Sequence, residues 1–260
     1  MAPSDEQVPP FVRLAAHEVR WRLMSELARG DLRVRELVAL LGQPQNLVSY
    51  HLRQLRAAGL VTARRSSFDG RDSYYHLNLE RCAQGLAETG AALHPALRSA
   101  PGPASSVAHP PVTTLLFLCT GNSGRSPIAE ALISRHSTAP DAPRIEVTSA
   151  GSHPKPHMHP GAVHVMRNRY GIDIAGQRPR HLDTMTGRRF DYVITLCDKV
   201  REVTPALGTR QAHWSIPDPA ALTADGEDSY PAFEQAAAEI DIRIRHLLPV
   251  LGSRPGRDPS

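Results

Sequence analysis

The stretch TTLLFLCTGNSGRSPIAEAL, residues 113–132, runs from an apolar segment through a cysteine and a glycine-rich turn into a helix-like pattern. Residues 113–119 form a short, continuous apolar run, which is typical of a buried parallel strand. Residues 126–136 place Ile128 and Leu132 one turn apart on a predicted helix. A strand, a tight turn and a helix in succession predict the start of an α/β domain.

Strands continue to alternate with helices toward the C-terminus. Three further strands are predicted at 144–151, 190–197 and 212–216, and two further helices at 159–171 and 230–251. This alternation predicts a three-layer, doubly wound α/β domain with a parallel four-stranded sheet. Ligands of such sheets bind at the carboxyl ends of the strands, which is where Cys119 stands.

The turn after Cys119 has the composition of an anion-binding loop. Its glycines permit backbone conformations that turn successive N–H groups inward at the N-terminus of the predicted helix. The loop lacks the G-K-[ST] ending of a nucleotide-binding P-loop, but Arg125 adds a planar fork of donors that matches a tetrahedral oxyanion. The residues predicted to bind the oxyanion are Thr120, Gly121, Asn122, Ser123, Gly124 and Arg125.

Cys119 stands at the base of this loop, where backbone dipoles and Arg125 favour the thiolate. Ser126 is placed to donate a hydrogen bond to the sulfur, and Asn122 to hold the loop in shape through bonds to the backbone. A thiolate aimed at the central atom of a bound oxyanion is a nucleophile. An acid must then protonate the leaving oxygen, and Asp218 stands between two prolines after a predicted strand. The predicted catalytic residues are Cys119, Arg125, Ser126 and Asp218.

The first part of the chain has a helical pattern that changes into a hairpin. Helices are predicted over 11–30, 33–42 and 43–61, the second with Leu37, Leu40 and Leu41 on one face. The Asp69-Gly70 pair predicts a turn between two strand-like runs. Two short helices across a tight turn, followed by a basic hairpin, predict a mainly helical, winged helix-turn-helix domain.

A chain of 260 residues is long enough for two such domains. The segment 95–111 is rich in Pro, Ala and Ser and has no apolar period, which predicts a linker. We therefore expect the winged-helix domain at 1–94, the α/β domain at 112–252 and a flexible tail at 253–260.

The winged-helix part also carries the charge that DNA binding requires. Between Arg20 and Asp72 stand ten arginines and five acidic residues, an excess that suits a nucleic-acid partner. A recognition helix would enter the major groove of double-stranded DNA with the hairpin beside it. The residues predicted to contact DNA are Gln45, Asn46, Ser49, Tyr50, Arg53, Arg64, Arg65 and Arg71.

VSYHLRQLRAAGLV (48–61) and RRSSFDGRDSYYHL (64–77) resemble the recognition helix and wing of ArsR-type transcriptional regulators. The resemblance covers about residues 10–94. It implies a homodimer, formed through this domain, that binds operator DNA and is released by an effector. The paired cysteines of many metalloid-sensing members are missing before the recognition helix. Cys82, near the predicted dimerisation helix, is either an effector ligand or a buried structural residue.

The pattern C-x5-R-S before a helix, with D-P about a hundred residues later, resembles the low-molecular-weight protein tyrosine phosphatase superfamily over residues 112–250. The resemblance implies that Cys119 is the nucleophile, Arg125 the oxyanion-binding residue, Ser126 the thiolate stabiliser and Asp218 the general acid. Phosphatases of this superfamily break a phosphotyrosine ester, whereas its arsenate reductases attack arsenate with the same thiolate. RSPIAEA is phosphatase-like, while HWSIPDPA and VITLCDK are closer to the reductases.

Cys197, in VITLCDK, matches the second, resolving cysteine of the thioredoxin-coupled reductases, and Thr204 stands where their third cysteine would fall. Either Cys197 forms a disulfide with Cys119 that an external reductant opens, or a small thiol attacks the arsenic–cysteine adduct directly. A buried structural role for Cys197 is the other alternative. Both catalytic routes need an external thiol reductant of the thioredoxin, glutaredoxin/glutathione or mycothiol type and no bound cofactor.

Composition excludes several other classes of protein. No apolar run approaches the roughly 20 residues of a membrane helix, and residues 1–10 lack a secretory pattern, so we expect a cytoplasmic protein with no membrane partner. Three cysteines do not make a disulfide scaffold. His153, His157 and His159 cluster in SHPKPHMHP, but no carboxylate or thiol completes a ligand set, so no metal site is predicted.

Both sets of motifs favour a DNA-binding regulator fused to an arsenate reductase-like domain. Its expected ligand is arsenate or a phosphate-type oxyanion. One alternative is a low-molecular-weight phosphatase tethered to a DNA-binding module. The other is a regulator that senses an oxyanion without catalysis.

Overall fold

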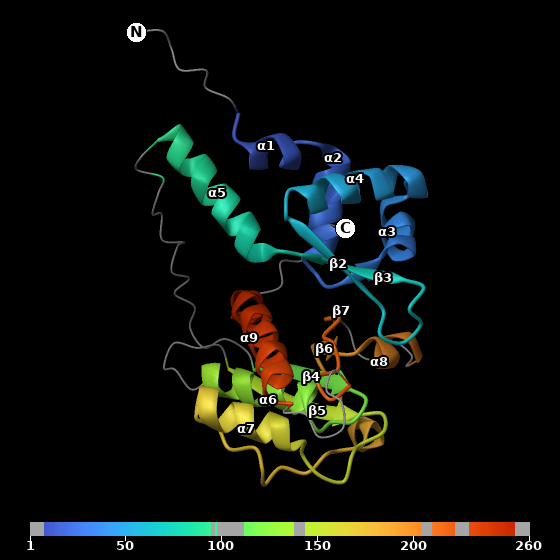
Figure 1. Ribbon diagram of the computed structural model, residues 1–260, viewed down its shortest axis with the longest axis vertical. Coiled ribbons are helices and arrows are strands. Elements are labelled where there is room, and N and C mark those ends of the chain that lie inside the picture. Colours follow the sequence, from blue (N-terminus) through green and yellow to red (C-terminus); the bar gives the residue numbers. More distant parts are fainter. Residues whose placement is uncertain are drawn as a thin grey trace. The chain divides into compact units, whose positions relative to one another are not determined.

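A computed structural model describes residues 8–94, 97, 112–137, 144–203, 210–221 and 229–252 (Figure 1). The chain divides into two compact units, Met1–Ser106 and Val107–Ser260, each with its own hydrophobic core. The predicted linker, 95–111, lies outside the described residues except for Leu97, and the predicted tail, 253–260, lies outside them entirely. Within the described ranges, no helix is long and apolar enough to cross a membrane.

The N-terminal unit is a mainly helical winged helix-turn-helix, as predicted. Its elements are α1 (Pro10–Ala15), α2 (Glu18–Leu27), β1 (Leu32–Arg33), α3 (Val34–Leu41), α4 (Gln45–Ala57), β2 (Val61–Arg65), β3 (Ser73–Leu77) and α5 (Leu79–Leu93). The strands pair antiparallel in the order β1-β3-β2. Gly70, in the turn between β2 and β3, has a φ of 70°, a left-handed conformation that glycine adopts without strain.

The helix predicted over 11–30 is instead two helices. α2 starts anew at Glu18 because His17 caps it, with Nδ1 accepting a hydrogen bond from the N–H of Val19 at 3.2 Å. The apolar spacing continues across the break, so the sequence pattern does not reveal it. The second difference is Leu40, which is 53% exposed, although its spacing from Leu37 and Leu41 placed it on the buried face of α3.

The C-terminal unit is a doubly wound α/β domain, as predicted. Its elements are β4 (Thr113–Cys119), α6 (Arg125–His136), β5 (Ile145–Gly151), α7 (Pro160–Tyr170), the 3-10 helix η2 (Leu182–Met185), β6 (Tyr192–Thr195), α8 (Asp198–Val203), β7 (Arg210–His213) and α9 (Tyr230–Gly252). The four strands are parallel, in the order β5-β4-β6-β7. α6 packs against β5 and α9, and α7 also packs against α9 (Figure 1).

The cysteine lies at the point where the order of the strands along the sheet reverses. β4 lies between β5, which follows it in the chain, and β6, which lies on its other side. Leu115 to Cys119 are all buried, which agrees with the continuous apolar run. In the parallel register, Cys119 at the carboxyl end of β4 stands opposite Gly151 at the end of β5. A switch point of this kind is where open α/β sheets bind ligands.

Two strands are shorter or displaced relative to the prediction. β6 ends at Thr195, so Cys197 lies beyond the strand, on the turn that leads into α8. β7 covers Arg210–His213 rather than 212–216, although Trp214 and Ile216 are buried. Their burial explains the apolar pattern, but the chain leaves the sheet before Pro217, which has no N–H for the ladder.

Candidate active site

The Cys119 thiol lies buried at the base of the loop that follows β4. The backbone N–H of Asn122 donates a hydrogen bond to Cys119 Sγ at 3.2 Å, and Ser126 Oγ lies 2.9 Å from the sulfur. Ser126 Oγ also accepts a hydrogen bond from Asn122 Nδ2 at 3.0 Å. When Cys119 is a thiolate it has no proton to donate, so the Ser126 hydroxyl is then the donor to the sulfur. Two donors that point at one sulfur stabilise negative charge on it.

Asn122 shapes the loop from a fully buried position. Its φ of 43° lies in the left-handed region, which costs an ordinary residue about 1–2 kcal/mol. Asn122 Nδ2 donates to Ser126 Oγ and to Ser149 Oγ (2.8 Å), and its Oδ1 accepts from the backbone N–H of Arg180 (2.7 Å). One of these three bonds is to backbone, as expected, while the other two reach hydroxyl groups.

The segment 152–159 takes up the carbonyl groups of the loop. The N–H groups of Ser152, His153, Lys155 and His159 donate to the carbonyl oxygens of Cys119, Thr120, Gly121 and Ser123, at 3.3, 2.8, 2.9 and 2.8 Å respectively. In a trans peptide the N–H points away from the preceding carbonyl, so the amides that follow these four carbonyls face the other side of the loop. Inward amides with outward carbonyls form an anion cradle.

Arg125 begins α6, whose positive N-terminal end is directed at the cradle. Its side chain is only 7% exposed, with Nη1 donating to the carbonyl of Ile216 (3.0 Å) and Nη2 to Asp218 Oδ2 (3.0 Å). The Asp218 side chain is 46% exposed, so this ion pair lies at the boundary with solvent. The structure therefore joins the predicted arginine to the predicted acid.

Phe233 of α9 packs against the cradle and against His159. The two rings stack with their centroids 4.5 Å apart, and a Cβ placed on Gly124 would lie 3.1 Å from the Phe233 ring. His159 Nδ1 accepts a hydrogen bond from the N–H of Gly161, which caps α7. Burial lowers the pKa of His159, although the charge of Asp218 raises it. His159 thus serves as a helix cap and a stacking partner.

Cys197 lies buried beside the first residue of the cradle. Its Sγ is 3.3 Å from Thr120 Oγ1. Burial raises the pKa of the Cys197 thiol, Cys119 raises it further, and the charge of Arg125 lowers it. Cys119 and Arg125 thus both act electrostatically on Cys197, and the two cysteines are free thiols.

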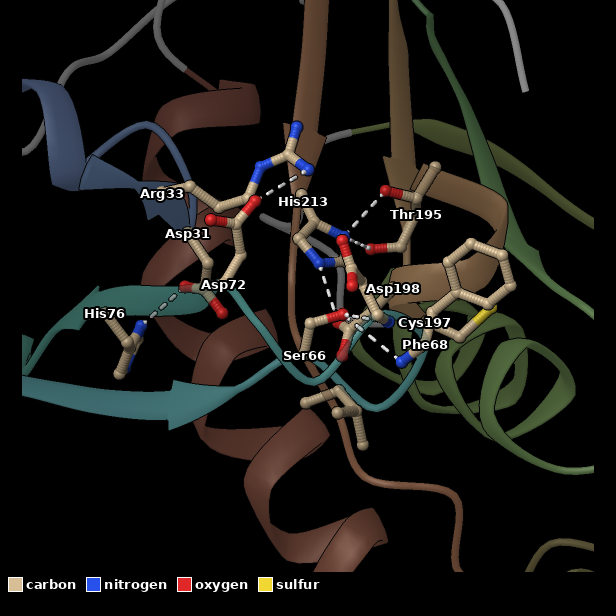
Figure 2. A network of polar contacts seen from close by, with 12 residues as sticks. Asp31, Arg33, Ser66, Phe68, Asp72, His76, Thr195, Cys197, Asp198 and His213 are labelled. Carbon is tan, nitrogen blue, oxygen red and sulfur yellow. Dashed lines mark hydrogen bonds and ion pairs between the residues drawn. The ribbon is translucent and has the colours of Figure 1, made fainter. Parts of the chain in front are cut away.

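One buried histidine fixes the turn that carries Cys197 (Figure 2). His213 Nδ1 lies 2.8 Å from Thr195 Oγ1, and its Nε2 lies 3.1 Å from Asp198 Oδ1. Thr195 ends β6 and Asp198 begins α8. His213 therefore connects the two ends of the turn and holds Cys197 between them.

In the N-terminal unit, α4 buries one face and exposes the face predicted to contact DNA. Val48, Leu52 and Leu55 are buried, and so is His51, whose pKa is lowered by burial and by its neighbours His17 and Arg20. The predicted contact residues are all exposed or half-buried: Gln45, Asn46, Ser49, Tyr50 and Arg53 on α4, and Arg64, Arg65 and Arg71 on the hairpin.

Cys82, the third thiol, is buried in the core of the N-terminal unit, where burial raises its pKa. A protonated, enclosed thiol is a weak ligand. The part of the chain that the structure describes holds no group of three or more His, Cys, Asp or Glu side chains that could hold a metal ion. His153 and His159 are engaged instead with Ser152 and Gly161.

Comparison with known families accounts for both units. The model of the low molecular weight phosphotyrosine protein phosphatase family matches residues 114–254, more than half of the chain. The chain belongs to this family. A second model, bacterial regulatory protein, arsR family, matches residues 17–63. The protein is thus an ArsR-family helix-turn-helix fused to a phosphatase-family domain.

Several relatives of the phosphatase-family domain are named arsenate reductases. The arsenate reductase of Bacillus licheniformis is 34% identical over 137 residues, which are 52% of this chain and 94% of that protein. The arsenate reductase of Shouchella clausii is 36% identical over 137 residues, 50% of this chain and 91% of that protein. Among solved structures, the thioredoxin-dependent arsenate reductase of Corynebacterium glutamicum is 24% identical with a TM-score of 0.42, covering 88% of this chain and 96% of that one.

The phosphatase-family site includes residues that were not predicted from the sequence: Glu130, Ser149, Gly151, His159, Arg180 and Phe233. Ser149 and Gly151 had a signal, because they end a strand that was predicted to lie in the same parallel sheet as Cys119. Arg180 had none, since it comes from an irregular segment 55 positions after Arg125. Its place beside Asn122 depends on tertiary structure alone.

Gly151→Ala is predicted to disturb the cradle. A Cβ at this position would lie 2.6 Å from the carbonyl oxygen of Thr120 and 2.8 Å from the backbone N of Asn122. Forcing these backbone atoms apart should lower the free energy of unfolding by about 1–3 kcal/mol. It should weaken oxyanion binding by a larger amount, because both atoms belong to the cradle. Gly176→Ala is the matched control, because a Cβ there meets nothing within 4 Å. Thermal unfolding and phosphate titration measure both effects; equal behaviour of the two variants would contradict the prediction.

Proposed function

We propose that this protein reduces arsenate to arsenite through Cys119 and binds operator DNA through its ArsR-family unit. The observation that carries the catalytic half is the cradle. Its amides face inward, α6 points its N-terminus at it, and Cys119 lies at its base. The arsenate reductases among the relatives support arsenic, rather than phosphorus, as the central atom of the substrate.

In the proposed first step, an arsenate oxyanion enters the cradle and takes over the Arg125 guanidinium from Asp218. Cys119 Sγ attacks arsenic, and an S–As bond forms as one oxygen leaves. Asp218, released from Arg125, takes up a proton from solvent and passes it to a hydroxyl oxygen of the arsenate, which departs as water. Ser126 and the Asn122 N–H stabilise the thiolate before the attack. The exposed side of Asp218 suits this role, because its proton must be replaced from solvent.

In the proposed second step, another thiol attacks Cys119 Sγ in the adduct. The new S–S bond replaces the S–As bond, whose electron pair stays on arsenic, so As(V) becomes As(III) while two thiols become a disulfide. We assign the attacking thiol to Cys197, which contacts Thr120 of the cradle. An external thiol reductant of the thioredoxin, glutaredoxin/glutathione or mycothiol type then reduces the disulfide. Thr204, at the place of a third cysteine, lies outside the described residues.

The second step should accelerate as pH rises. Burial, the largest cause, holds the pKa of Cys197 above its ordinary value against the lowering by the charge of Arg125, and only the thiolate attacks. At neutral pH the thiol form dominates, so formation of the Cys119–Cys197 disulfide should be slow and should rise with pH until that raised pKa is passed. Quenched-flow mapping of the disulfide after one arsenate turnover measures this rate. A rate that is flat from pH 7 to 9 would argue against Cys197 as the attacking thiol.

A paired assay of arsenate reduction and aryl phosphate hydrolysis tests the proposed reaction. Wild-type protein should release arsenite with a thiol reductant, and Cys197→Ser should lose turnover with a thioredoxin-type reductant. Residual turnover of Cys197→Ser with glutathione or mycothiol would assign the second step to a small thiol. Cys82→Ala, which removes a thiol from the other unit, is the control. If the wild type releases no arsenite with any thiol reductant, the proposed reduction is wrong.

The family itself favours a second candidate, the hydrolysis of a phosphotyrosine ester. The same cradle, thiolate and acid serve that reaction, in which water rather than a thiol attacks the intermediate. It predicts fast hydrolysis of aryl phosphates that Cys197→Ser leaves intact. If neither reaction occurs and an oxyanion still changes DNA affinity, the domain is a sensor.

For the DNA-binding half, we propose that α4 enters the major groove and that the β2–β3 hairpin contacts the adjacent backbone. Leu86 and Leu93 on α5, seven residues apart, are 60% and 77% exposed. This spacing puts both leucines on one helix face, which we propose as the homodimer contact. A twofold dimer presents two α4 helices to half-sites about 34 Å apart.

Arg53→Ala should weaken operator binding through loss of one phosphate contact. Each neutralised phosphate releases counterions, so the variant should bind about fivefold more weakly at 0.15 M salt and lose about 0.9 from its log–log salt slope. Fluorescence anisotropy over a salt series measures both quantities. Arg135→Ala removes an exposed charge from the phosphatase-family unit and serves as the control. An unchanged slope for Arg53→Ala would show that this side chain does not face DNA.

A further inference from the structure

Behind the cradle lies a second ion pair, formed by residues far apart in the chain. The Arg180 guanidinium donates through Nη2 to Glu130 Oε2 and through Nε to the carbonyl of Ser149 at 3.0 Å. Ser149 Oγ also lies 2.6 Å from Glu130 Oε2. The Glu130 side chain is 15% exposed and that of Arg180 41%. A mostly enclosed carboxylate is therefore neutralised by a cation that borders solvent.

The Asn122 amide connects this ion pair to the thiol. Its Nδ2 donates to two hydroxyls, Ser126 Oγ and Ser149 Oγ. Each hydroxyl accepts this bond and keeps its own proton to donate. Ser149 donates its proton to the Glu130 carboxylate, and Ser126 donates its proton to Cys119 Sγ when that sulfur is a thiolate. Through these two hydroxyls, the Asn122 amide stabilises two anions, the Cys119 thiolate and the Glu130 carboxylate.

These two anions are not equivalent, because only Glu130 has its own cation in this network. Without the guanidinium, Glu130 would leave an uncompensated negative charge that is coupled to Cys119 through Ser149, Asn122 and Ser126. A like charge disfavours a second anion nearby, and in a partly enclosed site water screens it poorly. The charge would oppose both the thiolate and an incoming oxyanion. The other charged pair at the cradle is Arg125 with Asp218. Within the described residues, neither of them forms an ion pair with Glu130 or Arg180.

We propose that Arg180 is a positioning residue for the cradle: its guanidinium cancels the charge of Glu130 and so keeps Cys119 reactive toward oxyanions. The inference rests on the proposed use of Cys119 as nucleophile. It concerns the side chain alone, because the main chain of Arg180 has separate roles. Its N–H donates to Asn122 Oδ1, and its carbonyl accepts from the N–H of Gly151. A side-chain substitution leaves these backbone groups in place.

The test compares Arg180→Met with Arg180→Lys, with the double variant Arg180→Met/Glu130→Gln, and with Arg178→Met as an exposed neighbouring control. The first readout is the pH dependence of Cys119 alkylation by iodoacetamide, followed by peptide mapping to separate Cys119 from Cys82 and Cys197. The second is the affinity for inorganic phosphate. Thermal unfolding reports whether each variant folds.

Arg180→Met should shift the pH midpoint of Cys119 alkylation upward by about one unit, which is about tenfold slower labelling near neutral pH. It should also bind phosphate more weakly. Arg180→Lys keeps the charge and should stay close to wild type, as should Arg178→Met. The double variant removes both charges and should recover most of the loss.

A merely structural role predicts a different pattern, in which the double variant labels as slowly as Arg180→Met or more slowly. That pattern, or an unchanged midpoint in a folded Arg180→Met, would overturn the inference. If Arg180→Met does not fold, the double variant and Arg180→Lys still decide between charge and structure. Neither readout needs turnover, so a wild type that fails to reduce arsenate would remove the proposed function without affecting this comparison.

Discussion

Cys119→Ser is expected to abolish arsenate reduction, with kcat/KM falling by at least about 10⁴-fold, the scale seen when an enzyme loses its nucleophile. A serine hydroxyl stays protonated in the surroundings that stabilise a thiolate, and it cannot form the S–As bond or the later disulfide. The oxygen still fits the same bonds from Asn122 N–H and Ser126 Oγ. The variant should therefore fold normally and still bind phosphate.

Single-turnover arsenite release and phosphate titration measure the two halves of this expectation. Cys82→Ala is the matched control, since it removes a buried thiol from the core of the other unit. Retained arsenite release by Cys119→Ser would place the chemistry elsewhere. Loss of phosphate binding together with turnover would show that the substitution had damaged the cradle rather than the nucleophile.

The site residues that are local in sequence could be predicted, and those joined only by the fold could not. Cys119, Asn122, Arg125 and Ser126 fall within eight residues, so spacing alone placed them on one loop. Asp218 is distant but follows a predicted strand of the same parallel sheet, and the carboxyl ends of such strands meet at one edge. The ion pair between Arg125 and Asp218 agrees with that expectation.

The role of Arg180 could not be predicted from the sequence. It acts through a backbone N–H to Asn122 and a guanidinium to Glu130, and no periodic pattern surrounds it in the sequence. The segment 152–159 is a related case, because its histidines suggested a metal site and no pattern in the sequence indicated a backbone role. Its main contribution is made by backbone N–H groups that hold the carbonyls of the cradle outward, and sequence carries almost no signal for such contacts.

The same distinction holds for the fold. The apolar spacing of α3 and α4 was enough to predict a helix-turn-helix, although it did not reveal the exposure of Leu40. The spacing over residues 11–30 likewise did not reveal the break at His17. Both depend on where neighbouring helices pack. Likewise, the apolar runs at 190–197 and 212–216 reflect burial that continues after β6 and β7 have ended. Strands were predicted over the whole of both runs, whereas β6 and β7 pair over only part of each.

Arg125→Lys should cost about 10²–10³-fold in kcat/KM, the scale seen for loss of one preorganised donor at a developing oxyanion. The guanidinium places Nη1 and Nη2 in one plane, bonded in the free protein to Ile216 O and Asp218 Oδ2. A lysine keeps the charge but offers a single ammonium on a different stem, so it cannot present two parallel donors to the oxyanion. Because charge on the oxygens grows as arsenic is attacked, kcat should fall more than KM rises.

Arg135→Lys provides the matched control, because Arg135 lies exposed near the other end of the same helix, α6. Steady-state kinetics over a range of arsenate concentrations separate the change in kcat from that in KM. If Arg125→Lys raised KM alone, the arginine would bind the oxyanion equally in the ground state and the transition state. The Arg125 guanidinium would then only bind the substrate. The stabilisation of the transition state would have to come from the inward amides of the cradle and the N-terminus of α6.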